Sequence, residues 1–469
     1  MTFKHRALIA LPLLLAGCNM APHYDRPALP VPPASPEGSA YPAAAPDKDA
    51  QSFAETAWSE FFTDPRLRTV IRTALDNNRD LRVAVANVEQ ARAQYRVQRA
   101  DILPAISGSG SATYQKSPFA TSTASSGRSD IYSASVGVSA WEVDLFGRVR
   151  NLTKAAQETF FAAEENRDAA QTALVAEVAT AWLTLASDSE QLQIARDTET
   201  AFGKTFDLTQ ARFKAGVASE LDVRQARTSL DSARSDIAEL TTTVAQDRNA
   251  LNLLAGTTLD AALLPGKLPE AGATLDNLPG NLPSSILLHR PDVAAAEHQL
   301  IAANADIGAA RAAFFPNISL TAAFGTLSLG LSNLFANGSQ NWSVAPTATL
   351  PIFDAGKNAA NLRYAKATRD AMVAQYEKAV QTAFSEVADA LARRGTIDDQ
   401  LSARTSLRDN AFKSYRLSEA RFKQGVDGFL STLDAERTYY TAEQGLVTTR
   451  LVRATNAVEL YRAVGGGLK

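Results

Sequence analysis

The sequence predicts a mainly helical chain with a membrane-facing β part, organised as one duplicated domain. Three observations predict this fold class. A segment of about 200 residues occurs twice, helical patterns fill two long proline-free stretches, and four short segments alternate polar and apolar residues. Each copy therefore combines segments that suit water with segments that suit lipid. This combination favours a symmetric structural device over an enzyme.

The duplication is visible in short motifs that recur at a constant spacing. Ala211–Val217 (ARFKAGV) returns as Ala420–Val426 (ARFKQGV), an offset of 209 residues. Pro104–Ser107 (PAIS) returns as Pro316–Ser319 (PNIS), an offset of 212 residues. Copies of this length are far too long to be units of a repeat array, so they indicate a duplicated domain.

The N-terminus indicates export and lipid attachment. Basic residues precede a short apolar run, Ala7–Ala16, which has the profile of a signal peptide and is too brief to span a bilayer. The run leads to Cys18, the only cysteine of the chain. A single thiol cannot form an internal disulfide, and its position after small residues favours lipid attachment. We expect residues 1–17 to be removed and Cys18 to be the lipidated first mature residue.

The remaining domain boundaries follow from proline content and from the repeat. Eight prolines fall between residues 21 and 46, which predicts an extended tether over residues 18–57. The first structural repeat is expected at residues 58–265 and the second at residues 284–469. Residues 266–283 are expected to link them.

Each repeat is predicted to contain a long helical hairpin. The helix from Arg148 to the glycine at Gly216 would contain close to 70 residues and extend roughly 100 Å. Gly216 and Gly425 suit the left-handed position that ends a helix, which places a hairpin corner at each. Apolar residues at steps of three and four form seams along the returning helices. The first seam comprises Val223, Ala226, Leu230, Ala233, Ile237, Leu240, Val244, Leu251 and Leu254, broken by Asp247, and the second comprises Leu430, Leu433, Tyr440, Val447, Leu451, Ala454, Val458 and Tyr461.

Two strand pairs, one in each copy, are predicted between the helices. Ile318, Leu320 and Phe324 alternate with polar residues, as Val136 and Val138 do in the first copy. The strands have about the ten residues that a tilted transmembrane strand needs. Four strands cannot close a barrel, so strands that face lipid require several chains, and three chains would give twelve strands and one shared pore. A small soluble sandwich is the alternative that weak alternation of this kind leaves open.

Composition excludes several classes of function. The net charge is −3, without the basic excess that a nucleic-acid partner requires. Beyond the signal segment, the chain contains three histidines, His23, His289 and His298, and no motif for a nucleophile, phosphate or metal. We expect no catalytic residue, no metal site and no cofactor apart from the lipid on Cys18.

Several motifs together resemble one protein family. They are Pro22–Pro27 (PHYDRP), Trp141–Arg148 (WEVDLFGR), Arg290–Val293 (RPDV) leading to Phe314–Pro316 (FFP), and Pro351–Gly356 (PIFDAG). On these motifs the chain resembles the TolC-like outer-membrane efflux proteins, specifically their OprM/NodT lipoprotein branch, over nearly its whole mature length.

The resemblance implies a homotrimer with a 12-stranded β-barrel in the outer membrane, continuous with a 12-helix periplasmic α-barrel. Such proteins are passive exit ducts. They receive drugs or other small solutes from an inner-membrane pump, usually of the resistance-nodulation-division class, through a periplasmic adaptor protein. Asn19, where lipoproteins kept at the inner membrane usually carry Asp, implies delivery to the outer membrane of a Gram-negative bacterium and contact with its lipid.

The resemblance also implies roles for residues near the two corners. The hairpin tip and the adaptor contact are expected at Arg212, Gly216, Arg421 and Gly425. Asp222 and Asp434 fall where family members place lumen-facing acidic residues near the constriction, and three copies of a carboxylate would favour cations. The alternative role for these two acids is that of a helix cap or a solvated surface charge. Some relatives carry a basic residue two positions after the second glycine, where this chain has Asp427.

Two alternatives to an efflux duct remain at this stage. A lipid-anchored periplasmic coiled-coil scaffold without a pore would explain the helices and Cys18, but not the strand pairs. Within the duct class, the cargo could instead be metal ions or a protein secreted by a type I system.

Overall fold

The computed structural model describes residues 18–42, 53, 55–116, 128–270, 272–275, 282–466 and 468. The proposed signal peptide lies outside these residues. The described chain divides into two compact units, each of which draws segments from both sequence repeats. Unit 1 contains residues 1–28, 87–164 and 295–376, and unit 2 contains residues 29–86, 165–294 and 377–469.

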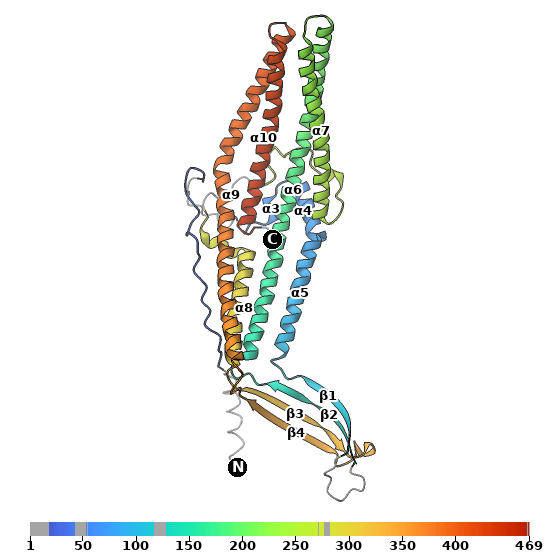
Figure 1. Cartoon of the computed structure of the whole chain (residues 1–469), viewed down its shortest axis with the longest axis vertical. Coiled ribbons are helices and arrows are strands. Elements are labelled where there is room, and N and C mark those ends of the chain that lie inside the picture. Colours follow the sequence, from blue (N-terminus) through green and yellow to red (C-terminus); the bar gives the residue numbers. More distant parts are fainter. Residues whose placement is uncertain are drawn as a thin grey trace. The chain divides into compact units, whose positions relative to one another are not determined.

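The same five elements occur in the same order in each half of the chain (Figure 1). The first half contains α5 (Arg79–Ala100), β1 (Ile106–Lys116), β2 (Arg128–Glu142), α6 (Arg148–Lys214) and α7 (Glu220–Ala255). The second half contains α8 (Pro291–Ala312), β3 (Asn317–Ser328), β4 (Gln340–Thr349), α9 (Lys357–Lys423) and α10 (Phe429–Ala463). The elements α6 and α9 each have 67 residues, close to the length that the sequence predicts. The two compact units cut across these halves, so the repeat boundaries remain predictions.

In unit 1, the four strands form one antiparallel sheet in the order β1-β2-β3-β4. Residues directly opposite one another in an antiparallel pair lie on the same face. Val136 is opposite Phe324, and Phe324 is opposite Trp342, so these apolar side chains share a face. Ser109 and Ser135 lie on the other face, where their hydroxyls hydrogen-bond at 3.0 Å. The predicted alternation is therefore confirmed as one apolar and one polar face.

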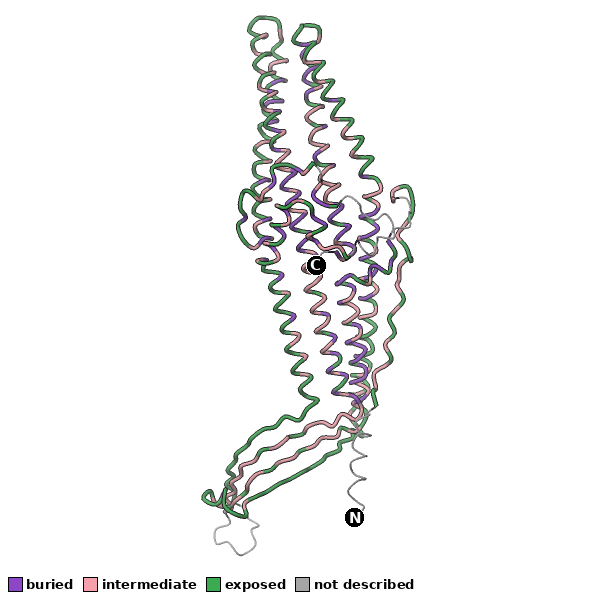
Figure 2. The backbone as a smooth tube through the Cα atoms, turned by 180° about the vertical axis from the view of Figure 1, so that it is seen from behind, coloured by how far each residue is buried: buried purple, intermediate pink, exposed green. Residues whose placement is uncertain are grey.

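The apolar face and both edges of this sheet are exposed. The side chains of Val136, Phe324 and Trp342 are 56%, 65% and 72% exposed. All residues of the edge strands β1 and β4 are exposed, whereas β3 is mostly half-buried (Figure 2). No second sheet covers this one within the described residues. The sandwich that the sequence left open is therefore not what the chain forms.

Residues 18–28 of the N-terminal segment belong to unit 1 and are held there by hydrogen bonds rather than by secondary structure. Residues 18–42 contain no helix, as their proline content predicts. Glu297 of α8 accepts from the guanidinium of Arg26 at 2.7 Å and from the hydroxyl of Tyr24 at 3.1 Å. Burial and the neighbouring Glu297 raise the pKa of Tyr24. Two polar contacts therefore fix this extended segment against a helix.

The core of unit 2 is aromatic and aliphatic. The short helices α3 (Trp58–Phe61) and α4 (Pro65–Asn77) contribute to it, and Asp64 caps α4 by accepting from two backbone amides. The ring of Phe61 stacks on Tyr461 of α10 with centroids 4.0 Å apart. Trp182, Phe61 and Tyr461 are almost completely buried. This packing joins the N-terminal helices of the first repeat to the last helix of the second.

The Arg290–Val293 motif is a structural clamp in unit 2. Arg290 is buried, and its guanidinium contacts Asp292 at 2.7 Å and Glu386 at 2.8 Å. It also donates to the carbonyl of Ala463, the last residue of α10, at 2.7 Å. A buried arginine needs such partners, and here they join the start of α8 to α9 and α10.

The predicted seams are largely buried, with informative exceptions. Ala226, Leu230, Ala233, Val244 and Leu251 of α7 are buried, but Leu430 of α10 is 59% exposed. Asp247, which breaks the first seam, interacts electrostatically with the carboxyl of Asp188 of α6. Burial and this second carboxyl raise the pKa of Asp188 to about 6. Within the described residues, α6 also contains an 18-residue window apolar enough to cross a membrane, but 56% of that window is buried inside the structure, as in a core helix.

Candidate functional site

Both hairpins of unit 2 turn through the same backbone motif. The amide of Gly216 donates to Phe213 and that of Val217 donates to Arg212, each at 2.9 Å. Gly425 and Val426 make the equivalent bonds at 3.0 and 2.9 Å. The φ angles of Gly216 and Gly425 are 78° and 76°, a left-handed conformation that favours glycine at a helix C-terminus. The hairpin corners therefore lie at Gly216 and Gly425, the positions that the sequence predicts.

The two arginines of the repeated motif have different partners. The guanidinium of Arg212 lies over the ring of Phe422, 4.6 Å from its centroid, and Nη1 donates to the Phe422 carbonyl at 3.5 Å. The guanidinium of Arg421 instead contacts both carboxylate oxygens of Asp427, at 2.6 and 2.7 Å. Arg212 thus crosses to the other hairpin, whereas Arg421 pairs within its own.

An apolar cluster holds the two hairpins together near their corners. It draws on all four helices and consists of Phe202, Ala226, Leu230, Ala233, Phe422, Phe429 and Leu433. Three polar contacts flank it: Thr205 to Glu436 at 3.2 Å, Arg437 to Ser229 at 2.9 Å and Tyr440 to Asp236 at 2.9 Å. We call the cluster and these contacts, with Arg212 on Phe422, the inter-hairpin contact.

The two acids predicted to line a gate differ in availability. Asp222 belongs to a capping box at the start of α7, accepting from the backbone amide of Ser219 at 2.9 Å while its own amide donates to the Ser219 hydroxyl at 3.1 Å. Asp434 is exposed on α10 and makes no ion pair or hydrogen bond with the described residues. The cap alternative therefore describes Asp222 well, whereas the side chain of Asp434 has no such local partner among the described residues.

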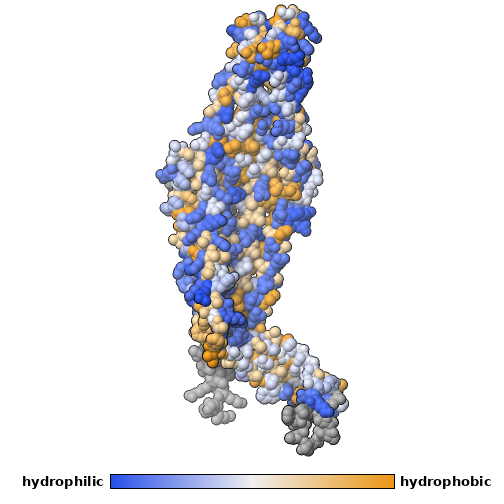
Figure 3. All heavy atoms as spheres, in the orientation of Figure 1, coloured by the Kyte–Doolittle hydropathy of each residue, from blue (hydrophilic) through white to orange (hydrophobic). Residues whose placement is uncertain are grey.

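Exposed apolar residues surround both corners. Val217 and Leu221 of the first hairpin are 65% and 64% exposed, and their equivalents Val426 and Leu430 are 63% and 59% exposed. Figure 3 shows hydrophobic residues gathered at the tips of the hairpins. The sequence indicates this similarity, because Val217 and Leu221 recur as Val426 and Leu430 at the common offset of 209 residues. A repeated exposed apolar patch is typical of a docking surface.

Sequence reasoning missed Glu436. This residue falls between Leu433 and Tyr440 at steps of three and four, so it occupies a seam position of α10. Its side chain is 3% exposed, and burial raises its pKa to about 7. A carboxylate on an apolar seam was the signal that could have found it.

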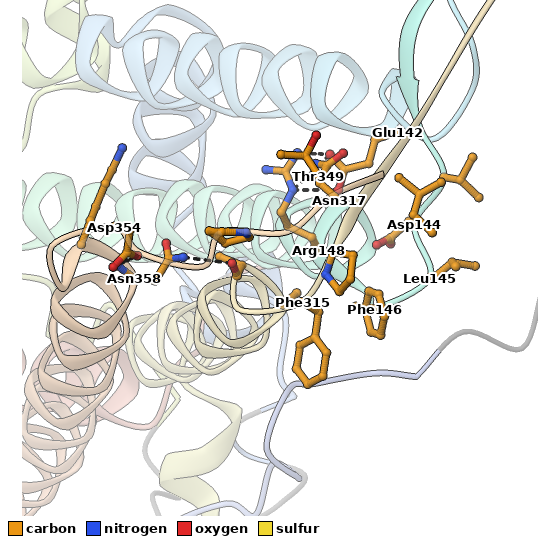
Figure 4. A pocket seen from close by; sticks show the side chains of 17 residues that line it. Glu142, Asp144, Leu145, Phe146, Arg148, Phe315, Asn317, Thr349, Asp354 and Asn358 are labelled. Carbon is orange, nitrogen blue, oxygen red and sulfur yellow. Dashed lines mark hydrogen bonds and ion pairs between the residues drawn. The ribbon is translucent and has the colours of Figure 1, made fainter. Parts of the chain in front are cut away.

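A second candidate site is the pocket where strands meet helices in unit 1. It has a volume of about 540 Å³ and is lined by residues from β2, β3, β4 and the starts of α6 and α9. Its carboxylates have local partners (Figure 4). Arg148 donates to Glu142 at 2.8 Å, and Asp354 accepts from the backbone amides of Gly356 and Asn358 at 2.9 Å. These bonds lower the pKa of Asp354.

The side chains of this pocket make local structural contacts. Its carboxylates serve an ion pair and a helix start, and the rings of Phe146 and Phe315 stack at 4.7 Å beside them. Over the described ranges, no group of three or more His, Cys, Asp or Glu side chains could hold a metal ion. The pocket is therefore a junction where strands pass into helices.

Cys18 is exposed and lies at the start of α6 in unit 1. The backbone at Cys18 passes close to Gly147, because a Cβ atom added to that glycine would lie 3.1 Å from the carbonyl oxygen of Cys18. The side-chain oxygen of Asn19 accepts a hydrogen bond from the side-chain amide of Asn151 at 2.9 Å. The carbonyl of Met20 accepts from Arg311 of α8 at 3.1 Å. The predicted lipid-bearing residue is thus held beside the strand–helix junction.

Comparisons with known proteins agree on one family. The family model described as "Outer membrane efflux protein" matches residues 70–257 and 282–466. The toluene efflux pump outer membrane protein TtgC of Pseudomonas putida is 46% identical over 469 residues, covering 100% of this chain and 96% of the relative. Outer membrane protein OprJ of Pseudomonas aeruginosa is 40% identical over 462 residues, covering 98% and 95%.

Solved structures give the same result. A membrane protein from Pseudomonas aeruginosa matches with a TM-score of 0.88 at 40% identity, covering 96% of this chain and 98% of that one. The open state of the MtrE outer membrane channel of Neisseria gonorrhoeae matches with a TM-score of 0.85 at 37% identity, covering 96% and 99%.

Proposed function

Because the chain belongs to the outer membrane efflux protein family, we propose in detail how it forms an exit duct. It is an outer-membrane component of an efflux system of a Gram-negative bacterium, and its family is one of transport channels rather than enzymes. The proposal concerns its assembly, its partners, its gate and its cargo.

The observation that carries the proposal is the open sheet of unit 1. One face is apolar and exposed, and β1 and β4 leave two unpaired edges. In lipid, unpaired backbone groups cost several kcal/mol each, so such a sheet must close. Three chains bring twelve strands, pair β4 of one subunit with β1 of the next, and enclose a pore lined by the polar face. The long hairpins of three chains then form the 12-helix periplasmic barrel.

Partners are assigned from the hairpin tips of unit 2. The apolar pairs Val217 with Leu221 and Val426 with Leu430 offer two similar surfaces per subunit to a helical adaptor protein. Arg212, Gly216, Arg421 and Gly425 shape these tips. The adaptor connects the duct to an inner-membrane pump of the resistance-nodulation-division class, and the lipid on Cys18 anchors the N-terminus to the membrane.

The inter-hairpin contact is the gate in this proposal. It holds the two hairpins of a subunit together, and its release would widen the periplasmic entrance. Asp434 would give that entrance a ring of three carboxylates that favours cations. The cargo is a small organic solute, since the curated relative named above is described as a toluene pump component.

Purified protein in planar bilayers tests the duct. We expect discrete conductance steps from a complex whose mass corresponds to three chains. A non-conducting monomer of the same mature chain would contradict the proposal and favour a coiled-coil scaffold.

A further inference from the structure

Glu436 is the one buried carboxylate of the inter-hairpin contact among the described residues. Its side chain is 3% exposed on α10. One carboxylate oxygen, Oε2, accepts from the Thr205 hydroxyl of α6 at 3.2 Å. The other, Oε1, is buried and has no hydrogen-bond partner in the described part of the chain. A buried acceptor without a donor is costly, and most of all when it carries a charge.

The surroundings of Glu436 do not compensate a negative charge. From α9, Glu419 adds a like charge and Tyr415 adds a phenol, and the carboxyl of Glu436 helps to raise the pKa of that phenol to about 12. From α6 comes the hydroxyl of Thr205. The nearest basic residue along α10 is Arg437, and its Nε donates to Ser229 of α7 at 2.9 Å. Among the described residues, no cation forms an ion pair with Glu436, and Arg416 and Lys423 of α9 pair with Glu419 instead.

Protonation removes this cost. Burial is the largest cause that raises the pKa of Glu436 to about 7, Glu419 adds to it, and the Thr205 hydrogen bond opposes it. A raised pKa means that the packed state binds the proton more tightly than the separated state does. Packing is therefore strongest below the ordinary value of 4.5 and weakens as the pH rises through about 7.

We propose that Glu436 is a proton-operated latch, which is neutral while the two hairpins are packed and loosens the inter-hairpin contact when it ionises. This inference deepens the proposed duct function, because the same contact is the gate assigned above. The equilibrium constant that favours packed over separated hairpins should fall about a hundredfold between pH 5 and pH 8. The separated state is already ionised at pH 5, whereas the packed state keeps its proton for roughly two further pH units.

Amide hydrogen exchange of the full mature protein in detergent tests the latch without reference to transport. Glu436→Gln keeps the shape and the acceptor for Thr205 but cannot ionise. At pH 8, its amides around Thr205 and Glu436 should exchange at least tenfold more slowly than those of the wild type. At pH 5, the two proteins should exchange alike. Glu459→Gln, an exposed change on the same helix, should match the wild type at both pH values.

A second variant separates the latch from a general packing role. Thr205→Val removes the hydrogen bond that favours the charged carboxylate, so the pH midpoint of exchange should rise. Equal exchange of wild type and Glu436→Gln at pH 8, or an unmoved midpoint in Thr205→Val, would overturn the inference.

Bilayer conductance then separates the latch from the duct. If both proposals hold, wild-type conductance increases from pH 5 to pH 8, and that of Glu436→Gln stays low at both. Slower exchange at pH 8 in Glu436→Gln with unaltered conductance would support the latch and contradict the gate.

Discussion

The two hairpin tips share a seven-residue motif but use it differently. Arg212 of the first tip extends to Phe422 of the second hairpin, whereas Arg421 of the second tip pairs with Asp427 beside it. The position equivalent to Asp427 in the first tip is Ala218. The first tip thus lacks a carboxylate at the position that pairs with the arginine in the second tip, and its arginine contacts the other hairpin instead.

The phenylalanines of the same motif show the complementary difference. Phe422 is 4% exposed within the inter-hairpin cluster, whereas its equivalent Phe213 is 42% exposed. The first tip therefore supplies the arginine and the second supplies the ring. The duplicated sequence forms the same turn twice, but the contact between the two turns is asymmetric because each turn contributes a different side chain.

The largest expected effect is at the ring. Phe422→Ala should destabilise the inter-hairpin contact by about 3 kcal/mol, because it leaves a cavity and removes the surface for Arg212. Phe213→Ala, the matched change in the other tip, should cost less than about 1 kcal/mol because that ring is half exposed. Trypsin cleavage at Lys214 and Lys423 measures the opening of the tips. Equal cleavage rates in both variants would contradict the asymmetry.

The arginines should differ by a smaller amount. Arg212→Ala removes a cation–π contact worth about 1 kcal/mol, which shifts the equilibrium between packed and separated hairpins about fivefold. Arg421→Ala removes an exposed ion pair that solvent screens and that lies within one hairpin, so its effect on opening should be smaller. Channel opening in bilayers should increase for the first variant only. An increase of the same size for Arg421→Ala would show that both arginines close the gate.

Substitution of Asp434 should change ion selectivity, whereas substitution of Asp222 should change the stability of α7. Asp434→Asn should lower the preference for cations by about twofold, because it removes an exposed charge that has no local partner among the described residues. Asp222→Asn should leave selectivity nearly unchanged and weaken the start of α7 by about 0.5 to 1 kcal/mol through its capping box. Reversal potentials in a salt gradient measure the first effect. A larger selectivity change for Asp222→Asn would return the gate role to that residue.

The smallest effect should come from making the tips alike. Ala218→Asp gives the first tip the carboxylate of the second, so Arg212 should pair locally and spend less time on Phe422. Opening should rise by less than in Arg212→Ala, about twofold. The double variant should open no more than Arg212→Ala alone, because Ala218→Asp acts only through Arg212. Fully additive effects of the two substitutions would argue against a shared partner.

Much of the fold could be predicted because it depends on local patterns. Steps of three and four defined α7 and α10, strict alternation defined the faces of β3, and the glycines at 216 and 425 marked corners that need a positive φ. These features depend on the backbone and on nearby residues, so they appear in the sequence.

The functional contacts were less accessible because they depend on which elements face each other. The same Ala-Arg-Phe-Lys motif gives no sign that Arg212 and Arg421 differ in partner. Leu430 fits the second seam by spacing, yet it is exposed, whereas Phe429 and Leu433 on either side of it are buried in the cluster. Asp222 forms a capping box with Ser219, a local contact that the sequence already contains, and its role at the lumen stays a prediction. Tertiary context decided the partners of the two arginines and the exposure of Leu430.

Disulfide trapping between β1 and β4 tests the central claim most directly, because these strands lie at opposite edges of one sheet and can meet only between subunits. A cysteine at Ser111 would be combined in turn with one at Asn341, Ser343, Ala345 or Thr347, which share its polar face. Paired strands lie about 4.8 Å apart, within reach of a disulfide. We predict that oxidation of at least one pair gives covalent trimers and nothing larger. Monomers at every pair, or a ladder of products beyond three chains, would contradict a closed three-subunit barrel.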